Sequence, residues 1–361
     1  MIVPDSPDLR LDALRAWLAP LAPQFGLELA TIEPASADAS FRRYFRVACT
    51  GGPHRSLIVM DAPPPHETTE PFIAVAKLMA QAGLHVPEIL AHDTAAGFML
   101  LTDLGNTTYL SALQATRYQD DDAYADTLMR LAIDALVRWQ LASRPQLLPP
   151  YDEATLRQEL ALFPRWFIGR HCERSLTSTQ SETLHAAFNQ IVKANLAQPR
   201  VFVHRDYMPR NLMVCEPGPG VLDFQDARFG PISYDVVSLM RDAFISWNEE
   251  RTLDWTIYYW KRARAAGLPV SDDLGSFWCD FEWMGLQRHL KVLGIFARIC
   301  HRDRKPQYLS DAGRFLIYVR SVAGRYDALH PLLKLFDELK LDALSIRESL
   351  YIHGAYTPYA S

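Results

Sequence analysis

The chain has 361 residues, 49% of them apolar and 22% charged, a balance that excludes extensive disorder and allows two lobes. A formal net charge of −5 without a dense run of lysine or arginine argues against nucleic acid as the main partner. The five cysteines are scattered and lack Cys-x-x-Cys spacing, which argues against a disulfide framework or a zinc site. No signal peptide and no apolar run of membrane-spanning length is evident, so we expect a cytoplasmic protein without membrane contact.

Short strands and two helices are expected over the first third of the chain. Strand-like apolar runs on either side of the turn residues 50–53 predict a hairpin, and apolar residues at helical spacing predict the flanking helices. The expected helices cover 8–22 and 69–82, and the expected strands cover 41–48, 55–61, 86–90 and 97–101. Residues 102–105 follow the last of these strands and are the expected hinge.

The rest of the chain is expected to be mainly helical. The helices expected from apolar periodicity cover 121–142, 153–170, 179–196, 234–247, 276–300, 309–325 and 330–350. Two short apolar strands, 201–203 and 220–222, interrupt them. We therefore expect an α+β, bilobal, protein-kinase-like fold, with a small antiparallel sheet in an N-lobe (1–105) and a larger helical C-lobe (106–361) that carries the catalytic loop and the acceptor site.

An ordered set of polar residues follows the two short strands. His204-Arg205-Asp206 comes after the first, Asn211 lies five residues beyond Asp206, and Asp223 follows the second strand. This order and spacing is typical of kinase-like phosphotransferases. One carboxylate, here Asp206, orients or deprotonates the attacking hydroxyl, while Asn211 and Asp223 hold the Mg²⁺ ions that bridge the phosphates of ATP.

Two stretches around this set carry a family resemblance. The sequences VHRDYMPRNLM (203–213) and LDFQDA (222–227) resemble the aminoglycoside phosphotransferase family. The resemblance extends from about residue 41 to about residue 300. It implies a kinase-like bilobal fold and ATP-dependent phosphorylation of a hydroxyl group on a small molecule.

A narrower resemblance rests on SADASFRRYFR (36–46), VMDAPP (59–64) and QRHLKVLG (287–294). These stretches are similar to bacterial N-acetylmuramate/N-acetylglucosamine anomeric kinases. That likeness implies phosphorylation of the C1 hydroxyl of an amino sugar, giving a sugar α-1-phosphate in cell-wall (peptidoglycan) recycling. The implied cofactors are ATP and Mg²⁺, and we expect a monomer.

The nucleotide site departs from protein kinases in two places. Residues 36–40 replace a glycine-rich loop, and Met60 stands where a strand lysine would contact the phosphates. We choose Arg43 as the replacement cation; the alternative is a solvated strand residue or one that braces the core. The adenine ring is expected to contact backbone groups near Leu101, Asp103 and Leu104.

Acceptor contacts are less constrained by the sequence. Arg288 and His289 lie on the 276–300 helix and offer cations to an anionic sugar, although a histidine bonded within the core is the more common case. Glu159 is a candidate from an earlier helix. Asp226 either binds the substrate, assists Asp223 or caps a turn.

Scaffolding roles are expected for three residues of the catalytic region. His204 and Arg205 are expected to support the loop instead of reacting, because a histidine at the end of a buried strand is more often a core residue than a catalyst. Asp235 matches a family aspartate and is expected to brace the same loop.

Two rival functions are open at this point. The first is an aminoglycoside or other small-molecule O-phosphotransferase, although the basic residues of the 276–300 helix favour an anionic or neutral sugar over a polycationic drug. The second is a non-catalytic nucleotide-binding pseudokinase, which the missing strand lysine favours and the set of Asp206, Asn211 and Asp223 disfavours.

Overall fold

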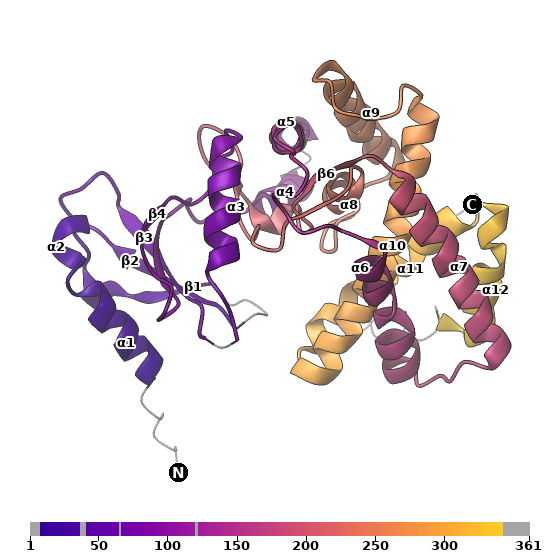
Figure 1. Ribbon diagram of the computed structural model, residues 1–361, viewed down its shortest axis with the longest axis horizontal. Coiled ribbons are helices and arrows are strands. Elements are labelled where there is room, and N and C mark those ends of the chain that lie inside the picture. Colours follow the sequence, from indigo (N-terminus) through magenta and orange to yellow (C-terminus); the bar gives the residue numbers. More distant parts are fainter. Residues whose placement is uncertain (1–7, 37–40, 65, 120–121, 342–361) are drawn as a thin grey trace, which may run out of the picture. The chain divides into compact units, whose positions relative to one another are not determined.

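The computed structural model describes residues 8–36, 41–64, 66–119 and 122–341. The chain divides into two compact units (Figure 1). The first unit combines Met1–Thr108 with Leu212–Asp226, and the second combines Tyr109–Asn211 with Ala227–Ser361. The segment Leu212–Asp226, which carries Asp223, thus belongs with the N-terminal part of the chain. The functional division into lobes at residue 105 stays a prediction.

The first unit is built on one antiparallel sheet. Its strands are β1 (Glu33–Ser36), β2 (Arg43–Ala48), β3 (Ser56–Asp61), β4 (Ile89–Asp93) and β5 (Phe98–Thr102), in the spatial order β1-β2-β3-β5-β4. The hairpin of β2 and β3 pairs Phe45 with Val59 and Ala48 with Ser56. Because alternate residues of a strand point to opposite faces, this register places Phe45, Val47, Leu57 and Val59 on one face.

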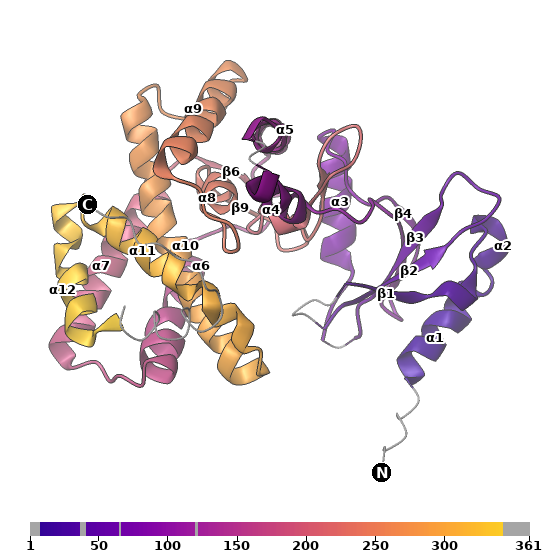
Figure 2. The same cartoon turned by 180° about the vertical axis from the view of Figure 1, so that it is seen from behind.

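Helix α1 (Leu9–Leu18) covers that face of the sheet. Its Leu14 and Leu18 join the strand residues in a buried cluster, and the ring of Trp17 lies 5.7 Å from that of Phe98. Helix α3 (Glu70–Gln81) lies on the other side of the sheet, as Figures 1 and 2 show. The short helix α2 (Ala22–Phe25) and the 3-10 helix Leu29–Thr31 connect α1 to β1.

A small hairpin completes the first unit. Strands β7 (Leu212–Met213) and β8 (Gly220–Val221) pair with each other, and Val221 donates its N–H to the carbonyl of His85 over 2.8 Å. A Cβ atom added at Gly220 would lie 2.8 Å from Cδ1 of Leu104. The hairpin therefore packs closely against the expected hinge.

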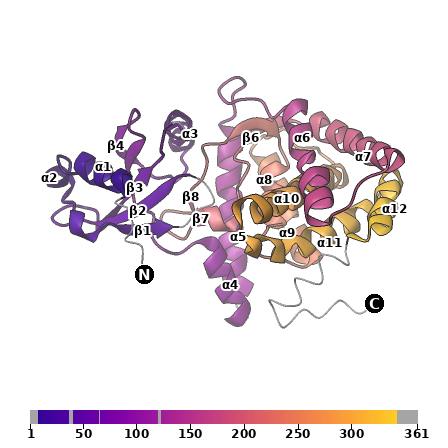
Figure 3. The ribbon, with the colours of Figure 1, turned by 90° about the horizontal axis from the view of Figure 1, so that it is seen from below.

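The second unit is helical and centred on one long helix, α10 (Leu274–Asp303), which contacts most of the others. Figure 3 shows α7 and α12 side by side at one end of this unit. The other α-helices are α4 (Tyr109–Gln119), α5 (Asp122–Leu141), α6 (Glu153–Leu160), α7 (Ser178–Ala197), α8 (Tyr234–Met240), α9 (Glu249–Ala265), α11 (Ala312–Ala323) and α12 (His330–Leu339).

Shorter elements complete the second unit. Strands β6 (Arg200–Val203) and β9 (Arg228–Pro231) form an antiparallel pair beside the catalytic loop. A π-helix covers Phe163–His171, and 3-10 helices cover Pro209–Asn211, Pro306–Asp311 and Asp327–Leu329. Within the described ranges, no helix combines the length and the apolar composition that crossing a membrane requires.

The long periodic helices and the central hairpin are confirmed, and the differences have local causes. The helix expected over 153–170 changes to a π-helix at Phe163, next to Pro164, which lacks the N–H that an α-helix needs. The helix expected over 234–247 ends at Met240, where Asp242 instead accepts the N–H groups of Phe244 and Ile245.

Other boundaries also differ. The strand expected over 86–90 forms at Ile89–Asp93, after Pro87, and the helix expected over 8–22 ends at Leu18. Helix α12 ends at Leu339, and residues 342–350 of its expected range lie outside the described residues. Strands β1 and β9 and helices α4 and α9 were not expected.

Candidate active site

The predicted catalytic residue Asp206 lies in a compact loop that follows β6 in the second unit. Its carbonyl oxygen accepts the N–H of Met208 and the Nδ2 of Asn211, each over 2.9 Å, and its own N–H donates to Nδ1 of His204 over 3.3 Å. These bonds join Asp206 and Asn211 in one folded loop. Because the amide nitrogen of Asn211 bonds inside the loop, the carbonyl oxygen is the atom of that side chain to which the predicted metal-binding role would fall.

Asp235, at the start of α8, braces this loop as expected. Its carboxylate accepts the backbone N–H of His204 over 2.6 Å and that of Arg205 over 3.0 Å. Burial raises the pKa of Asp235 to about 7, although the two backbone bonds act in the opposite direction. His204 is itself buried, edge-on to Tyr207, which fits the scaffolding role predicted for it.

The predicted metal ligand Asp223 lies in the first unit, just after β8. Its backbone is left-handed, with φ of 61°, and its carboxylate accepts Nε2 of Gln225 over 2.7 Å. The next residue, Phe224, is fully buried, and its ring centre lies 4.7 Å from that of Phe72 on α3. Helix α3 therefore anchors the segment that carries Asp223. Asp226, a predicted substrate contact, is exposed.

The chemistry of the two predicted metal ligands fits a hard cation. An amide oxygen and a carboxylate oxygen are the ligand types that Mg²⁺ takes from proteins, with phosphates supplying further oxygens. Over the parts of the chain that the structure describes, no three His, Cys, Asp or Glu side chains gather into a metal site.

The expected hinge residues lie together at the end of β5. Asp103 accepts Nε and Nη2 of Arg46 over 2.6 and 3.0 Å, and Oγ of Ser56 over 2.6 Å. Burial would raise the pKa of Asp103, but these bonds outweigh it and lower the pKa. The carboxylate of Asp103 thus braces the sheet. Leu101 and Leu104 are buried.

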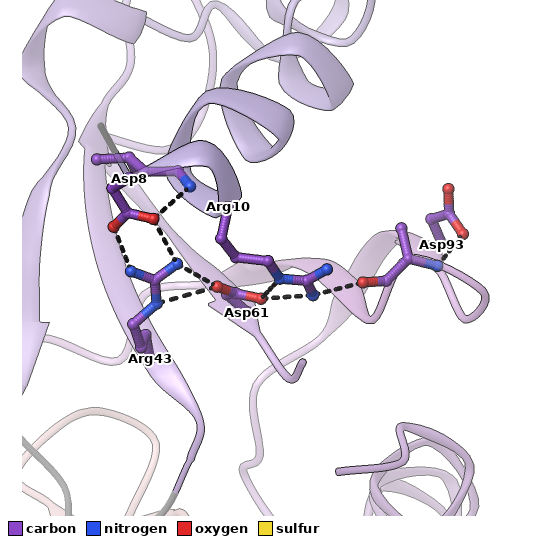
Figure 4. Close-up of polar contacts among 7 residues, drawn as sticks. Asp8, Arg10, Arg43, Asp61 and Asp93 are labelled. Carbon is purple, nitrogen blue, oxygen red and sulfur yellow. Dashed lines mark hydrogen bonds and ion pairs between the residues drawn. The ribbon is translucent and has the colours of Figure 1, made fainter. Parts of the chain in front are cut away.

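Arg43, the predicted substitute for the strand lysine, has internal partners instead. Figure 4 shows its guanidinium between Asp8 and Asp61, with Arg10 on the far side of Asp61. Arg43 donates Nε and Nη2 to Asp61 over 3.0 and 2.7 Å. In the β2–β3 register Arg43 lies opposite Asp61, whereas Met60 lies opposite Tyr44.

Residues directly opposite each other share a face of the sheet, so Arg43 and Met60 point to opposite faces. Arg43 lies on the face that α1 covers, and the structure does not place it where the missing lysine would be. The interpretation that Arg43 braces the core is the one that its contacts favour. Of the two other arginines nearby, Arg42, just before β2, pairs with Glu67 over 2.8 Å, and Arg46, within β2, pairs with Asp103.

Three of the predicted acceptor contacts are buried among internal partners. Arg288 is 2% exposed and donates Nη2 to Oγ of Ser238 over 2.7 Å. His289 is fully buried beside the rings of Phe315 and Tyr318, and burial holds its pKa well below the ordinary value. A neutral histidine offers no cation to an acceptor, so the core role for His289 is favoured. Glu159 is buried too, and Arg205 donates to it over 2.6 Å.

Sequence reasoning missed the contacts of two buried carboxylates, Asp61 and Glu159. A signal for Asp61 was available, because strand alternation places it on the same face as Leu57 and Val59, where a carboxylate needs a cationic partner. No comparable signal existed for Glu159. Apart from Tyr151, its partners come from segments that are 46 or more residues away.

Comparisons with known proteins show the family of this chain. A family model described as the phosphotransferase enzyme family matches residues 31–270. The chain is 48% identical to the N-acetylmuramate/N-acetylglucosamine kinase of Pseudomonas aeruginosa, over 92% of this chain and 98% of that protein. It is also 48% identical to a protein of the same name from Neisseria meningitidis serogroup B, over 90% of this chain and 95% of that one.

A solved structure supports the fold. An amicoumacin kinase, in complex with AMP-PNP, Ca²⁺ and Ami, matches with a TM-score of 0.58 at 13% identity, covering 87% of this chain and 96% of that one. At this identity the likeness shows the fold alone, and it confirms the expected α+β, kinase-like class. The family match and the two relatives go further, since they cover most of this chain. The chain therefore belongs to the phosphotransferase enzyme family and is an enzyme that transfers a phosphoryl group.

Proposed function

We propose that this chain is an ATP-dependent sugar 1-kinase that phosphorylates the anomeric hydroxyl of N-acetylmuramate and N-acetylglucosamine. The observation that carries the proposal is the 48% identity, over nearly the whole of both chains, to kinases named for these two sugars. The catalytic loop supports it, because Asp206 is held in place through its backbone and its carboxylate remains partly exposed.

Asp206 is the group that engages the acceptor. Its carboxylate accepts the proton of the C1 hydroxyl while that oxygen forms a bond to the γ-phosphorus, and the bond from phosphorus to the bridging oxygen of ADP breaks. The transition state of such a transfer is loose, so alignment of the hydroxyl matters more than a strong base. An anomeric hydroxyl is also more acidic than an ordinary alcohol. The products are ADP and a sugar α-1-phosphate.

Asn211 and Asp223 are the proposed ligands for Mg²⁺, each offering one hard oxygen. When bound, the ion neutralises the charge that develops on the phosphates. The amicoumacin kinase structure contains a nucleotide analogue and a divalent cation, which supports the same kind of pairing here. For the adenine ring we propose the backbone at Leu101, Asp103 and Leu104, since the carboxylate of Asp103 is occupied by Arg46 and Ser56.

The remaining proposals follow from the chemistry. A kinase that uses ATP and keeps five free cysteines fits the cytoplasm, and we propose a monomer that acts there. Asp226 is exposed and remains a proposed acceptor contact. We propose that the enzyme acts in peptidoglycan recycling, where a later step would consume its product, the sugar 1-phosphate.

A coupled assay of ADP release tests the proposal. Purified protein with ATP and Mg²⁺ is supplied with N-acetylmuramate, N-acetylglucosamine, glucose or kanamycin, and Asp206→Asn serves as the control variant. We expect turnover on the two N-acetyl sugars that the substitution abolishes. Turnover on kanamycin alone would make the chain an antibiotic phosphotransferase. Nucleotide binding without turnover on any acceptor would make it a pseudokinase.

A further inference from the structure

We propose that Glu159 on α6 and Lys291 on α10 are positioning residues, which act on catalysis by holding the side chain of Arg205 and thereby the orientation of Asp206. The proposal rests on the role of Asp206 in the proposed function. It gives Glu159 a different task from the acceptor contact that the sequence suggested.

Arg205 has an unfavourable backbone conformation next to the catalytic residue. Its φ is 79°, in the left-handed region that residues with a side chain rarely adopt. The surrounding structure must therefore fix this residue if Asp206 is to keep its direction. The backbone N–H of Arg205 donates to Asp235 over 3.0 Å, and its Nη2 donates to Glu159 over 2.6 Å. Both ends of the residue are thus held.

Glu159 has no capacity to spare for an acceptor. Besides Arg205, its carboxylate accepts Nε2 of Gln287 over 2.9 Å and the hydroxyl of Tyr151, and Nζ of Lys291 lies 3.1 Å away. The side chain is only 10% exposed. Burial would raise the pKa of Glu159, but the charges of Lys291 and Arg205 outweigh it and lower the pKa to about 2. Glu159 is therefore an anion at neutral pH, although it is buried inside the unit.

Lys291 closes the contacts into a ring. Its ammonium group donates to the hydroxyl of Tyr234 over 2.9 Å as well as contacting Glu159. Tyr234 directly precedes Asp235, the carboxylate that accepts the backbone of the catalytic loop. The ring runs from Glu159 to Arg205, through Asp235 and Tyr234 on α8, and back through Lys291. A change at one member is expected to reach Asp206 through its neighbour Arg205.

The chain offers a matched control for this ring. Glu282, on the same helix as Lys291, is also a buried carboxylate, 2% exposed, that pairs with an arginine, Arg325, and accepts a tyrosine hydroxyl, Tyr326, over 2.7 Å. None of its contacts in the described part of the chain involves the catalytic loop. Glu159→Gln and Glu282→Gln therefore remove similar buried charges in the same unit.

Steady-state kinetics with N-acetylglucosamine and ATP separate the possibilities. We expect Glu159→Gln to lower kcat by roughly 10- to 100-fold, as a displaced catalytic group does, with the KM for each substrate changing by less than about twofold. Glu282→Gln is expected to leave kcat within about twofold of the wild type while both variants lose thermal stability. In Glu159→Gln/Arg205→Met, kcat is expected to be no lower than in the worse single variant, because the two residues act as one unit.

Two results would overturn the proposal. A kcat for Glu159→Gln equal to that of Glu282→Gln would show a merely structural role, and a raised KM for the sugar at unchanged kcat would show an acceptor contact. If Glu159→Gln does not fold, Lys291→Met is judged by the same criteria. This variant removes Lys291 from the ring but leaves the buried charge of Glu159 paired with Arg205.

Hydrogen exchange does not require turnover, so it tests the ring of contacts separately from the proposed function. If the wild type turns over none of the acceptors, the proposed function fails, yet exchange over residues 201–213 can still be compared. Faster exchange there in Glu159→Gln than in Glu282→Gln is the result expected from the ring of contacts. Equal exchange in the two variants would refute it.

Discussion

The cluster of Asp61 with Arg10 and Arg43 makes a quantitative prediction about the first unit. Asp61 is fully buried and receives Nε and Nη2 of both arginines, at 2.6 to 3.0 Å. In Asp61→Asn the shape is kept, but one oxygen becomes an NH₂ group that faces guanidinium donors. The substitution therefore removes the charge and turns attractive contacts into repulsive ones.

The magnitude follows from how deeply the partners are buried. Breaking a fully buried ion pair by removing one partner costs about 3 to 5 kcal/mol. The two arginine side chains are 31% and 36% exposed, so solvent screens part of the charge that is left behind. We expect a loss of about 2 to 3 kcal/mol in the local stability of α1 and of the β2–β3 hairpin.

Hydrogen exchange followed by mass spectrometry measures this loss of local stability directly. In Asp61→Asn, peptides from α1 and β2 are expected to exchange roughly 30- to 160-fold faster, which is the same loss expressed as a ratio. Peptides from α10, in the second unit, serve as the internal reference.

Asp8→Asn is the control variant for this experiment. Asp8 also pairs with Arg43, but its side chain is 43% exposed, so its removal is expected to cost less than about 1 kcal/mol. Equal effects of Asp8→Asn and Asp61→Asn would refute the reasoning, because burial would then not decide the strength of these pairs.

Three further predictions concern Glu159, α10 and the metal. Because the pKa of Glu159 is lowered in the folded state, its ionisation contributes about 3 kcal/mol to the free energy of unfolding above pH 4.5, and this contribution is lost as the pH falls towards 2. In urea unfolding, the difference in stability between the wild type and Glu159→Gln should therefore narrow over this pH range. A difference that stays constant would contradict the ion pairing. A Cβ atom at Gly294 would lie 2.4 Å from the backbone of Leu162, so Gly294→Ala should cost about 1 to 3 kcal/mol in thermal unfolding. At Gly285 the nearest atom would be 3.4 Å from the added Cβ atom, so Gly285→Ala should cost little stability. Equal losses of stability in Gly294→Ala and Gly285→Ala would contradict the close packing of α10 against Leu162. Asp223→Asn should raise the Mg²⁺ concentration needed for half-maximal turnover by about tenfold or more, whereas an unchanged requirement would remove Asp223 from the metal site.

The sequence predicted that Asp206 and Asn211 share one loop, because the information for that loop is local. Asp206 and Asn211 lie five residues apart, and the bond from Nδ2 of Asn211 to the carbonyl of Asp206 follows from the turn that the intervening residues make. The same holds for the hairpin of β2 and β3, where alternating burial and turn residues agree. In such segments the nearest neighbours in the chain are also the nearest neighbours in space.

For Arg43, strand alternation is informative but incomplete. It places Arg43 on the same face as Phe45, but it does not show that α1 covers that face, because packing of a helix on a sheet is not encoded within the strand. The register with Asp61 settles the matter. Alternation within one strand assigns each side chain to a face of the sheet, whereas the element that packs on that face is known only from the fold.

Glu159 shows where sequence reasoning ends. Its partners Arg205 and Lys291 lie 46 and 132 residues further along the chain, and no pattern links them. Helix α9 was missed for a different reason. Its buried face carries Trp255, Tyr259 and threonines in place of the aliphatic residues whose spacing marks a helix most clearly.

The most direct test of the central claim is the position of the phosphate on the product. N-acetylmuramate or N-acetylglucosamine is treated with ATP, Mg²⁺ and the protein, and the product is analysed by phosphorus and proton NMR. We expect a phosphorus signal coupled to the anomeric proton in the α configuration, and no such product with Asp206→Asn. Phosphate on any other carbon, or product formation that persists in Asp206→Asn, would contradict the account.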